Sequence, residues 1–150
     1  MAKLQAFWVH GVSVQMEREG YFISKRRYGF GAKFNTHGEE WFHFAIPTPV
    51  ILDGKRSSLI KIFVLYETEG TAKITAVHAY DAGWKFKSFD NLSLSGNHST
   101  IDDYNSWLID PPREIIYGLG ISVHVDFGER RKDSVPGILF RSAGADFTTP

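Results

Sequence analysis

Two tryptophans and many short polar side chains gather in one turn-rich segment, residues 81–107. Flat aromatic rings stack on the apolar face of a pyranose, while carboxylates and amides bond its hydroxyls. Loops of this composition bind ligands when a rigid sheet positions them. The segment therefore predicts a glycan-binding site. The residues expected to contact the glycan are Trp84, Asp90, Asn91, Asp102, Asp103, Asn105 and Trp107.

The same segment has a structural interpretation, which stays open at this point. Asp, Asn, Ser and Gly are the usual turn formers, because their side chains bond the local backbone or tolerate left-handed conformations. Trp84 and Trp107 would then belong to the core. Residues 101–105 also supply part of the oxygen set that Ca²⁺ prefers, so calcium stays an alternative. We predict no cofactor and assign no metal ligand.

A second group of chemically capable residues is His37, Glu39, Glu40 and His43. A zinc or iron site would need His and carboxylate ligands on one face, and the chain has no His-x-His pair. His43 shares its strand face with Trp41, whereas His37 falls in a glycine-containing turn. This pattern favours a turn followed by a strand over a metal site.

Catalytic signatures are weak throughout the chain. Six histidines are present, but the sequence has no Gly-x-Ser-x-Gly elbow. Seventeen acidic residues give no means of choosing a glycosidase pair. We therefore assign no catalytic residue and favour a non-enzymatic binding module. A small hydrolase or isomerase is a remote alternative.

Composition limits the classes of partner. Lys plus Arg and Asp plus Glu both total 17 among 150 residues, so the formal net charge is zero, and no nucleic-acid partner is predicted. Cysteine is absent, which excludes disulfides and thiolate chemistry. The 12 Phe, 6 Tyr and 4 Trp exceed what one small core hides, so we expect a homo-oligomer. A structural or self-assembling protein without a small-molecule ligand is the alternative function.

The N-terminal residues 1–15 alternate in polarity and contain no apolar run of signal-peptide length. They predict a strand. No segment approaches about 18 consecutive apolar residues, so no membrane span is expected. A cytoplasmic location is the default expectation, and export by another route stays open.

The pattern of turns and alternation predicts an all-β chain. Glycines recur at intervals suited to short strands. Residues 115–127 alternate over thirteen positions, with a bend expected at Gly118 or Gly120. Residues 58–67 are apolar on both faces, which indicates a central strand. We predict one domain, residues 1–150, folded as a jelly-roll-like antiparallel β-sandwich, with a β-barrel as the alternative.

Four connections follow from turn chemistry. Asp53-Gly54 predicts a tight turn, and Gly70 a hairpin. The prolines of residues 46–50 exclude a central strand there. Residues 128–137 read as a polar hairpin loop. Residues 99–108 could begin a helix of at most two turns, capped by Ser99 or Thr100.

Several strings, among them "FWVHGVSV", "RRYGFG", "WFHFAIPTPVILDG", "FDNLSLSGNHSTID", "GLGISVHVDF" and "SAGADF", carry a resemblance to a known family. The chain resembles small, uncharacterised, mostly bacterial, β-rich proteins over nearly its entire length. The resemblance implies a β fold. It implies no activity and no functional residue.

Overall fold

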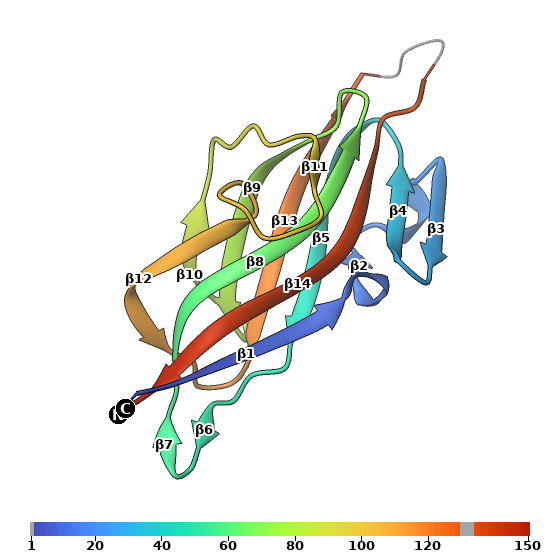
Figure 1. Cartoon of the computed structure of the whole chain (residues 1–150). Coiled ribbons are helices and arrows are strands. Elements are labelled where there is room, and N and C mark those ends of the chain that lie inside the picture. The colour runs from blue at the N-terminus through green and yellow to red at the C-terminus, as the bar shows by residue number, and fades with distance from the viewer. Residues whose placement is uncertain (1, 130–133) are drawn as a thin grey trace.

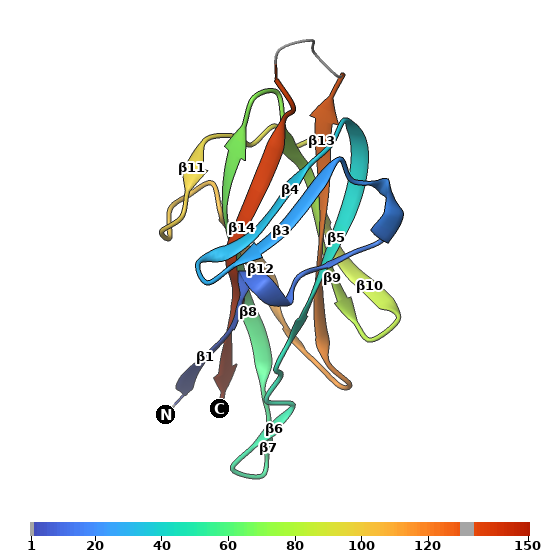
Figure 2. The ribbon, with the colours of Figure 1, turned by 90° about the vertical axis from the view of Figure 1, so that its right-hand side faces the viewer.

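The computed structural model describes residues 2–129 and 134–150 as two antiparallel β-sheets packed face to face (Figure 1 and Figure 2). The seven-stranded sheet contains β1 (Lys3–His10), β3 (Ser24–Tyr28), β4 (Gly31–Asn35), β8 (Ser58–Glu69), β11 (Asn97–His98), β12 (Ser106–Glu114) and β14 (Gly137–Thr149). The five-stranded sheet contains β2 (Gln15–Met16), β5 (Gly38–Ile46), β9 (Lys73–Asp81), β10 (Trp84–Phe89) and β13 (Leu119–Gly128). The hairpin β6 (Ile51–Leu52) and β7 (Lys55–Arg56) extends from one end (Figure 1).

Strand pairing sets the layers. In the seven-stranded sheet β8 pairs with β14 on one side and with β11 and β12 on the other, and β14 also pairs with β1 and β4. In the other sheet the order is β10-β9-β13-β5-β2. Two 3₁₀ turns, η1 (Gly11–Ser13) and η2 (Glu19–Tyr21), lie next to β2. The predicted antiparallel β-sandwich is confirmed, and the barrel is not formed because the strands pair in separate sheets.

Alternation along the strands builds the core between the sheets. Inward residues of β13, such as Ile121 and Val123, are fully buried, and they face inward residues of β14 and β8 such as Phe140 and Tyr66. Successive side chains of a strand point to opposite faces, so the intervening residues lie on the outer faces. Each sheet therefore has one outer face, and packing of the core does not determine which residue types lie on it.

The predicted turns are largely confirmed. Asp53 and Gly54 both adopt positive φ, 52° and 74°, and join β6 to β7. Gly70, with φ of 65°, lies between β8 and β9. Residues 47–50 form no strand, and β8 is central in its sheet, as expected. The predicted loop of residues 128–137 includes residues 130–133, which lie outside the described residues.

Two predictions are wrong. Residues 99–105 form a turn and not a helix, since side chains there bond the backbone in place of the helical ladder. The strand predicted for 115–127 begins only at Leu119, after a bend at Gly118, where φ is +154°. Tyr117, which alternates in step with Ile121 and Val123, is 81% exposed, whereas those two residues are buried. The bend itself was predicted.

None of the helices among the described residues has the length and apolar character needed to cross a bilayer.

Candidate functional site

The structure separates the two tryptophans of the predicted site. Trp84 begins β10 and is 71% exposed, whereas Trp107 on β12 is 9% exposed. The ring of Trp107 lies 6.3 Å from that of Phe89 and packs in the core. The stacking role predicted for Trp107 is therefore wrong, because the alternation of β12 turns this ring inward. Trp84 remains accessible.

Asp102 and Asn105 hold their own loop together. Asn105 is fully buried, and its Nδ2 donates to the carbonyls of His98 and Thr100 at 3.0 and 2.6 Å. The carboxylate of Asp102 accepts from the amide of Tyr104 and from Nδ1 of His98, both at 2.7 Å. The ligand contact predicted for Asn105 is wrong, because burial leaves no atom for a ligand. Asp102 has a structural role.

The remaining predicted residues, Asp90, Asn91 and Asp103, are exposed. Asp90 and Asn91 follow the end of β10, and six residues of strand place Asp90 about 20 Å from Trp84. Asp103 lies in the turn before β12. The predicted residues therefore do not form one site. Asp90 instead contacts His78, which lies on a different surface.

That surface is the outer face of the five-stranded sheet. The strand register places Ser88, His78, Ser122, His43 and Gln15 side by side across all five strands. The next row contains an indole and a further imidazole, opposite each other on β5 and β13. We call this surface the histidine–tryptophan face, and define it by Trp41, His43, His78, Tyr80, Ser122 and His124.

Trp41 lies across the middle of this face. Its ring centroid is 4.8 Å from that of His124 on the neighbouring strand β13 and 4.9 Å from that of His78 on β9. Strands β5 and β9 are two spacings apart, about 10 Å, so the indole must extend over β13 to reach His78. It is half-buried. This placement gives the face a flat apolar surface.

Hydrogen bonds fix the imidazoles around that indole. The Nε2 atom of His78 lies 2.8 Å from Oδ1 of Asp90. His43 lies 3.1 Å from Glu17 through Nε2 and 2.8 Å from Oγ of Ser122 through Nδ1. A carboxylate only accepts, so in neutral His43 Nε2 donates to Glu17 and Nδ1 accepts the Ser122 hydroxyl proton. The side chains are thus held before any ligand arrives.

The electrostatics of the face are polar and mixed. The hydrogen bond from His78 is the largest cause that lowers the pKa of Asp90, and the positive charge of Lys85 adds to it. Beside Trp41 the surface is hollowed, by about 230 Å³, toward Glu17 and Arg18. Among the described residues, no group of three or more His, Asp or Glu side chains is arranged to hold a metal ion.

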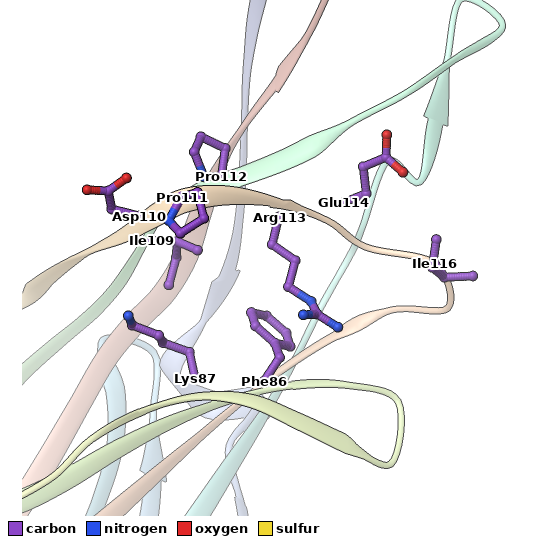
Figure 3. Close-up of a pocket in the computed structure, with 9 residues that line it drawn as sticks. All are labelled: Phe86, Lys87, Ile109, Asp110, Pro111, Pro112, Arg113, Glu114 and Ile116. Atoms are coloured by element: carbon purple, nitrogen blue, oxygen red, sulfur yellow. The ribbon is translucent and has the colours of Figure 1, made fainter.

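A separate groove of about 500 Å³ lies between β10 and β12, at the edge of the sandwich (Figure 3). Its origin is local. The pairing of β12 with β8 shifts between Leu108 and Arg113, where β12 carries two prolines that lack backbone donors. The lining residues are Phe86, Lys87, Ile109, Asp110, Pro111, Pro112, Arg113, Glu114 and Ile116.

Sequence reasoning missed most of the histidine–tryptophan face. The alternation of residues 38–46 does place Trp41 and His43 on one face, which was noted. His78 and His124 each lie between apolar residues of their own strand. The sequence of one strand, however, does not show which strands will lie beside it. The sequence feature that could have indicated this face is in residues 38–46, where the polar side of the strand carries the large rings of Trp41 and His43 in place of the usual Lys, Glu and Thr.

Comparison with known proteins gives a family and a set of distant folds. Residues 2–143 match the model of DUF6623, a family of unknown function. The chain belongs to this family. The match confirms the resemblance seen in the sequence and assigns no activity. No curated protein matches the chain.

Solved structures with similar folds include three carbohydrate-binding modules. The xylan-binding module CBM15 is 13% identical, with a TM-score of 0.47 over 99% of this chain and 97% of that one. TmCBM61 in complex with β-1,4-galactotriose is 12% identical, with a TM-score of 0.45 over 95% and 86%. CBM36 in complex with calcium and xylotriose is 10% identical, with a TM-score of 0.40 over 94% and 96%. At these values the likenesses carry no argument about ligand or site.

Proposed function

We propose that this chain is a non-enzymatic glycan-binding module and that the histidine–tryptophan face is its binding surface. The observation that carries the proposal is the position of Trp41, whose indole spans β13 between His78 and His124. A pyranose that stacks on this ring would lie near the imidazole, hydroxyl and carboxylate groups of the neighbouring strands. The predicted glycan ligand is thus kept, while the site moves from the loop to the sheet.

The chemistry around Trp41 suits sugar hydroxyls. Each hydroxyl both donates and accepts, so it pairs with mixed groups such as the imidazole of His124 and the carboxylates of Asp90 and Glu17. Those groups already have fixed orientations, which lowers the entropic cost of binding. The face is broad and shallow, which suits one side of an extended oligosaccharide better than an enclosed small molecule.

The two carboxylates at this face are already used to orient histidines. Glu17 lies 3.1 Å from His43 and Asp90 lies 2.8 Å from His78. This role supports binding without catalysis.

The proposal is tested by screening neutral plant and microbial oligosaccharides on a glycan array and measuring hits by calorimetry. Trp41→Ala should weaken binding by about thirtyfold or more, the effect of removing a central aromatic contact. Trp84→Ala is the matched control, since Trp84 is exposed and lies beyond the face. Near-ultraviolet circular dichroism confirms that both variants are folded.

Two results would overturn the proposal. One is a folded Trp41→Ala variant that binds like the wild type. The other is loss of binding in Trp84→Ala alone, which would return the site to the predicted segment. Trp41→Tyr keeps a flat ring and should retain part of the affinity, so it separates loss of stacking from loss of folding.

Self-association is the second candidate, and a specific surface favours it. On the outer face of the seven-stranded sheet, Ala6, Asp146, Lys61 and Leu108 form one row across four strands. Leu108 is 62% exposed. Asp146 forms no hydrogen bond or ion pair with any described residue, and burial raises its pKa although the charge of Lys61 lowers it. A second copy, related by a two-fold axis, would pair Lys61 with Asp146 in both directions.

A further inference from the structure

The groove between β10 and β12 has a consistent arrangement of charge. Figure 3 shows the side chains of Phe86 and Lys87 extending from β10 toward β12, and Arg113 extending from β12 toward Phe86. The carboxylates of Asp110 and Glu114 point away from this space (Figure 3). The alternation of β12 explains the difference, because Arg113 lies on the opposite face of the strand from both acids. The cationic side chains thus point into the groove, and the acidic side chains point away from it.

Neither cation has an anionic partner among the described residues. Lys87 and Arg113 form no ion pair and no hydrogen bond there. The contacts of both are with rings: Arg113 lies 4.6 Å from the centroid of Phe86, and the ammonium of Lys87 lies 5.7 Å from that of Phe89. Two positive charges beside aromatic rings, without a carboxylate between them, leave room for an anion.

Asp81, the acid whose pKa is affected by the charge of Arg113, already has other hydrogen-bond donors. The charge of Arg113 acts on Asp81. The carboxylate of Asp81, however, accepts hydrogen bonds from the backbone amides of Ile116, Tyr117 and Gly118 at 2.9, 2.9 and 3.2 Å. Burial raises the pKa of Asp81, but these three hydrogen bonds together with Arg113 outweigh it and the pKa is lowered. Three backbone amides already satisfy this carboxylate, so it does not require a hydrogen bond from the guanidinium. Arg113 keeps its N–H groups for another acceptor.

The stacking of Arg113 on Phe86 orients those N–H groups. A guanidinium that lies over a ring presents its edge away from the ring face, and that edge is the part that binds carboxylates through two parallel hydrogen bonds. Phe86 and Pro111 supply apolar walls on either side. At about 500 Å³ the groove falls in the range of small-molecule sites.

We infer that this groove binds a six-membered ring that bears a carboxylate, with Arg113 holding the carboxylate, Phe86 contacting the ring and Lys87 adding positive charge on the other side of Phe86 (Figure 3). The acid unit of an acidic glycan and a free aromatic carboxylate share this chemistry. The site is distinct from the histidine–tryptophan face. The inference therefore does not rest on the proposed binding of neutral glycans there.

The test measures binding of two probes, digalacturonate and benzoate, by calorimetry or NMR titration at low salt. At least one should bind, and the methyl ester of that probe should bind about tenfold more weakly or worse, because a charge-assisted hydrogen bond is lost. Affinity should also fall as salt screens the charges. Binding of digalacturonate supports an acidic glycan as the source of the carboxylate, and binding of benzoate alone supports a free aromatic acid.

Variants decide the location. Arg113→Gln should weaken binding about tenfold. Lys87→Gln should weaken it less, because only a more distant positive charge is removed, and Arg113→Lys keeps the charge and should also lose less. Lys85→Gln is the matched control, because Lys85 lies on the same strand beside Tyr80, on the outer face of the sheet. Failure of both probes to bind, equal binding of the esters, or an equal loss in Lys85→Gln would overturn the inference. Neutral glycan binding should be unchanged in Arg113→Gln, so failure here leaves the proposed function intact.

Discussion

The imidazole of His78 and the carboxylate of Asp90 lie 2.8 Å apart, although His78 is on the sheet and Asp90 is in the loop that follows the neighbouring strand. This contact joins one residue of the predicted site to the histidine–tryptophan face. It fixes the ring that packs against Trp41. The orientation of His78 in the histidine–tryptophan face therefore depends on Asp90, which lies outside that face.

The first prediction concerns this contact. Asp90→Ala should weaken glycan binding about tenfold, because His78 loses the acceptor that orients it. Asp103→Ala is the control, since Asp103 is an exposed residue of the originally predicted loop. Calorimetry on the best array ligand compares the two. An effect in Asp103→Ala that exceeds the effect in Asp90→Ala would argue for the loop as the binding site.

A pH dependence follows from His98. Its two ring nitrogens lie 2.7 Å from Asp102 Oδ2 and 2.8 Å from the carbonyl of Ser95, and both partners only accept, so the cationic ring is preferred. Desolvation lowers the pKa of His98, but these hydrogen bonds and the charge of Asp102 outweigh it and the pKa is raised. In Asp102 burial raises the pKa, while His98 and backbone amides outweigh it and lower the pKa.

The signs define a window of pH. A raised pKa in His98 means that its contribution is complete below the ordinary value of 6.5 and is lost as pH rises through the folded pKa. A lowered pKa in Asp102 means that its contribution is present above 3.8 and is lost as pH falls through the folded pKa. A double-mutant cycle with His98→Gln and Asp102→Asn, measured by denaturant unfolding, should give a larger coupling at pH 5.5 than at pH 8.5. Equal coupling at both values would contradict the charged pair.

Gly144 should resist substitution. A Cβ at this position would overlap the indole of Trp8, which lies on it beside Phe63 with ring centroids 5.0 Å apart. Gly144→Ala should lower the free energy of unfolding by about 1–3 kcal/mol, the usual cost of forcing extra atoms into a packed site. Gly83→Ala is the control, because no atom lies within 4 Å of its added Cβ. Chemical denaturation measures both, and equal stabilities would refute the close packing of Trp8.

The self-association candidate makes a charge-swap prediction. If two copies pair Lys61 with Asp146, then Lys61→Asp or Asp146→Lys alone places like charges together, and each should weaken the dimer about tenfold or more. The double variant restores opposite charges and should recover dimerisation. Light scattering over a range of concentrations reads the mass. A monomeric wild type at micromolar concentration removes this candidate.

Strand alternation and turn chemistry determined much of the fold. Residues 58–67 are apolar on both faces, and they lie in the central strand β8, where side chains such as Trp8 over Phe63 also cover part of the outer face. The Asp53-Gly54 turn was equally local, since its positive φ values favour these two residues. The inward and outward faces of residues 119–127 also followed from period-two alternation. These features depend on neighbours in the chain.

The binding surface was decided by the tertiary structure. Trp41, His78 and His124 are up to 83 residues apart in sequence numbering, and strand register brings the centroids of both imidazoles within 5 Å of that of the indole. Trp107 and Trp84 both lie near the start of a strand, yet one is in the core and one is exposed, because burial depends on what the opposite sheet supplies. A sequence records which side chains share a face of one strand. It does not record which strands lie beside it, and a site built across three strands forms only when the sheet does.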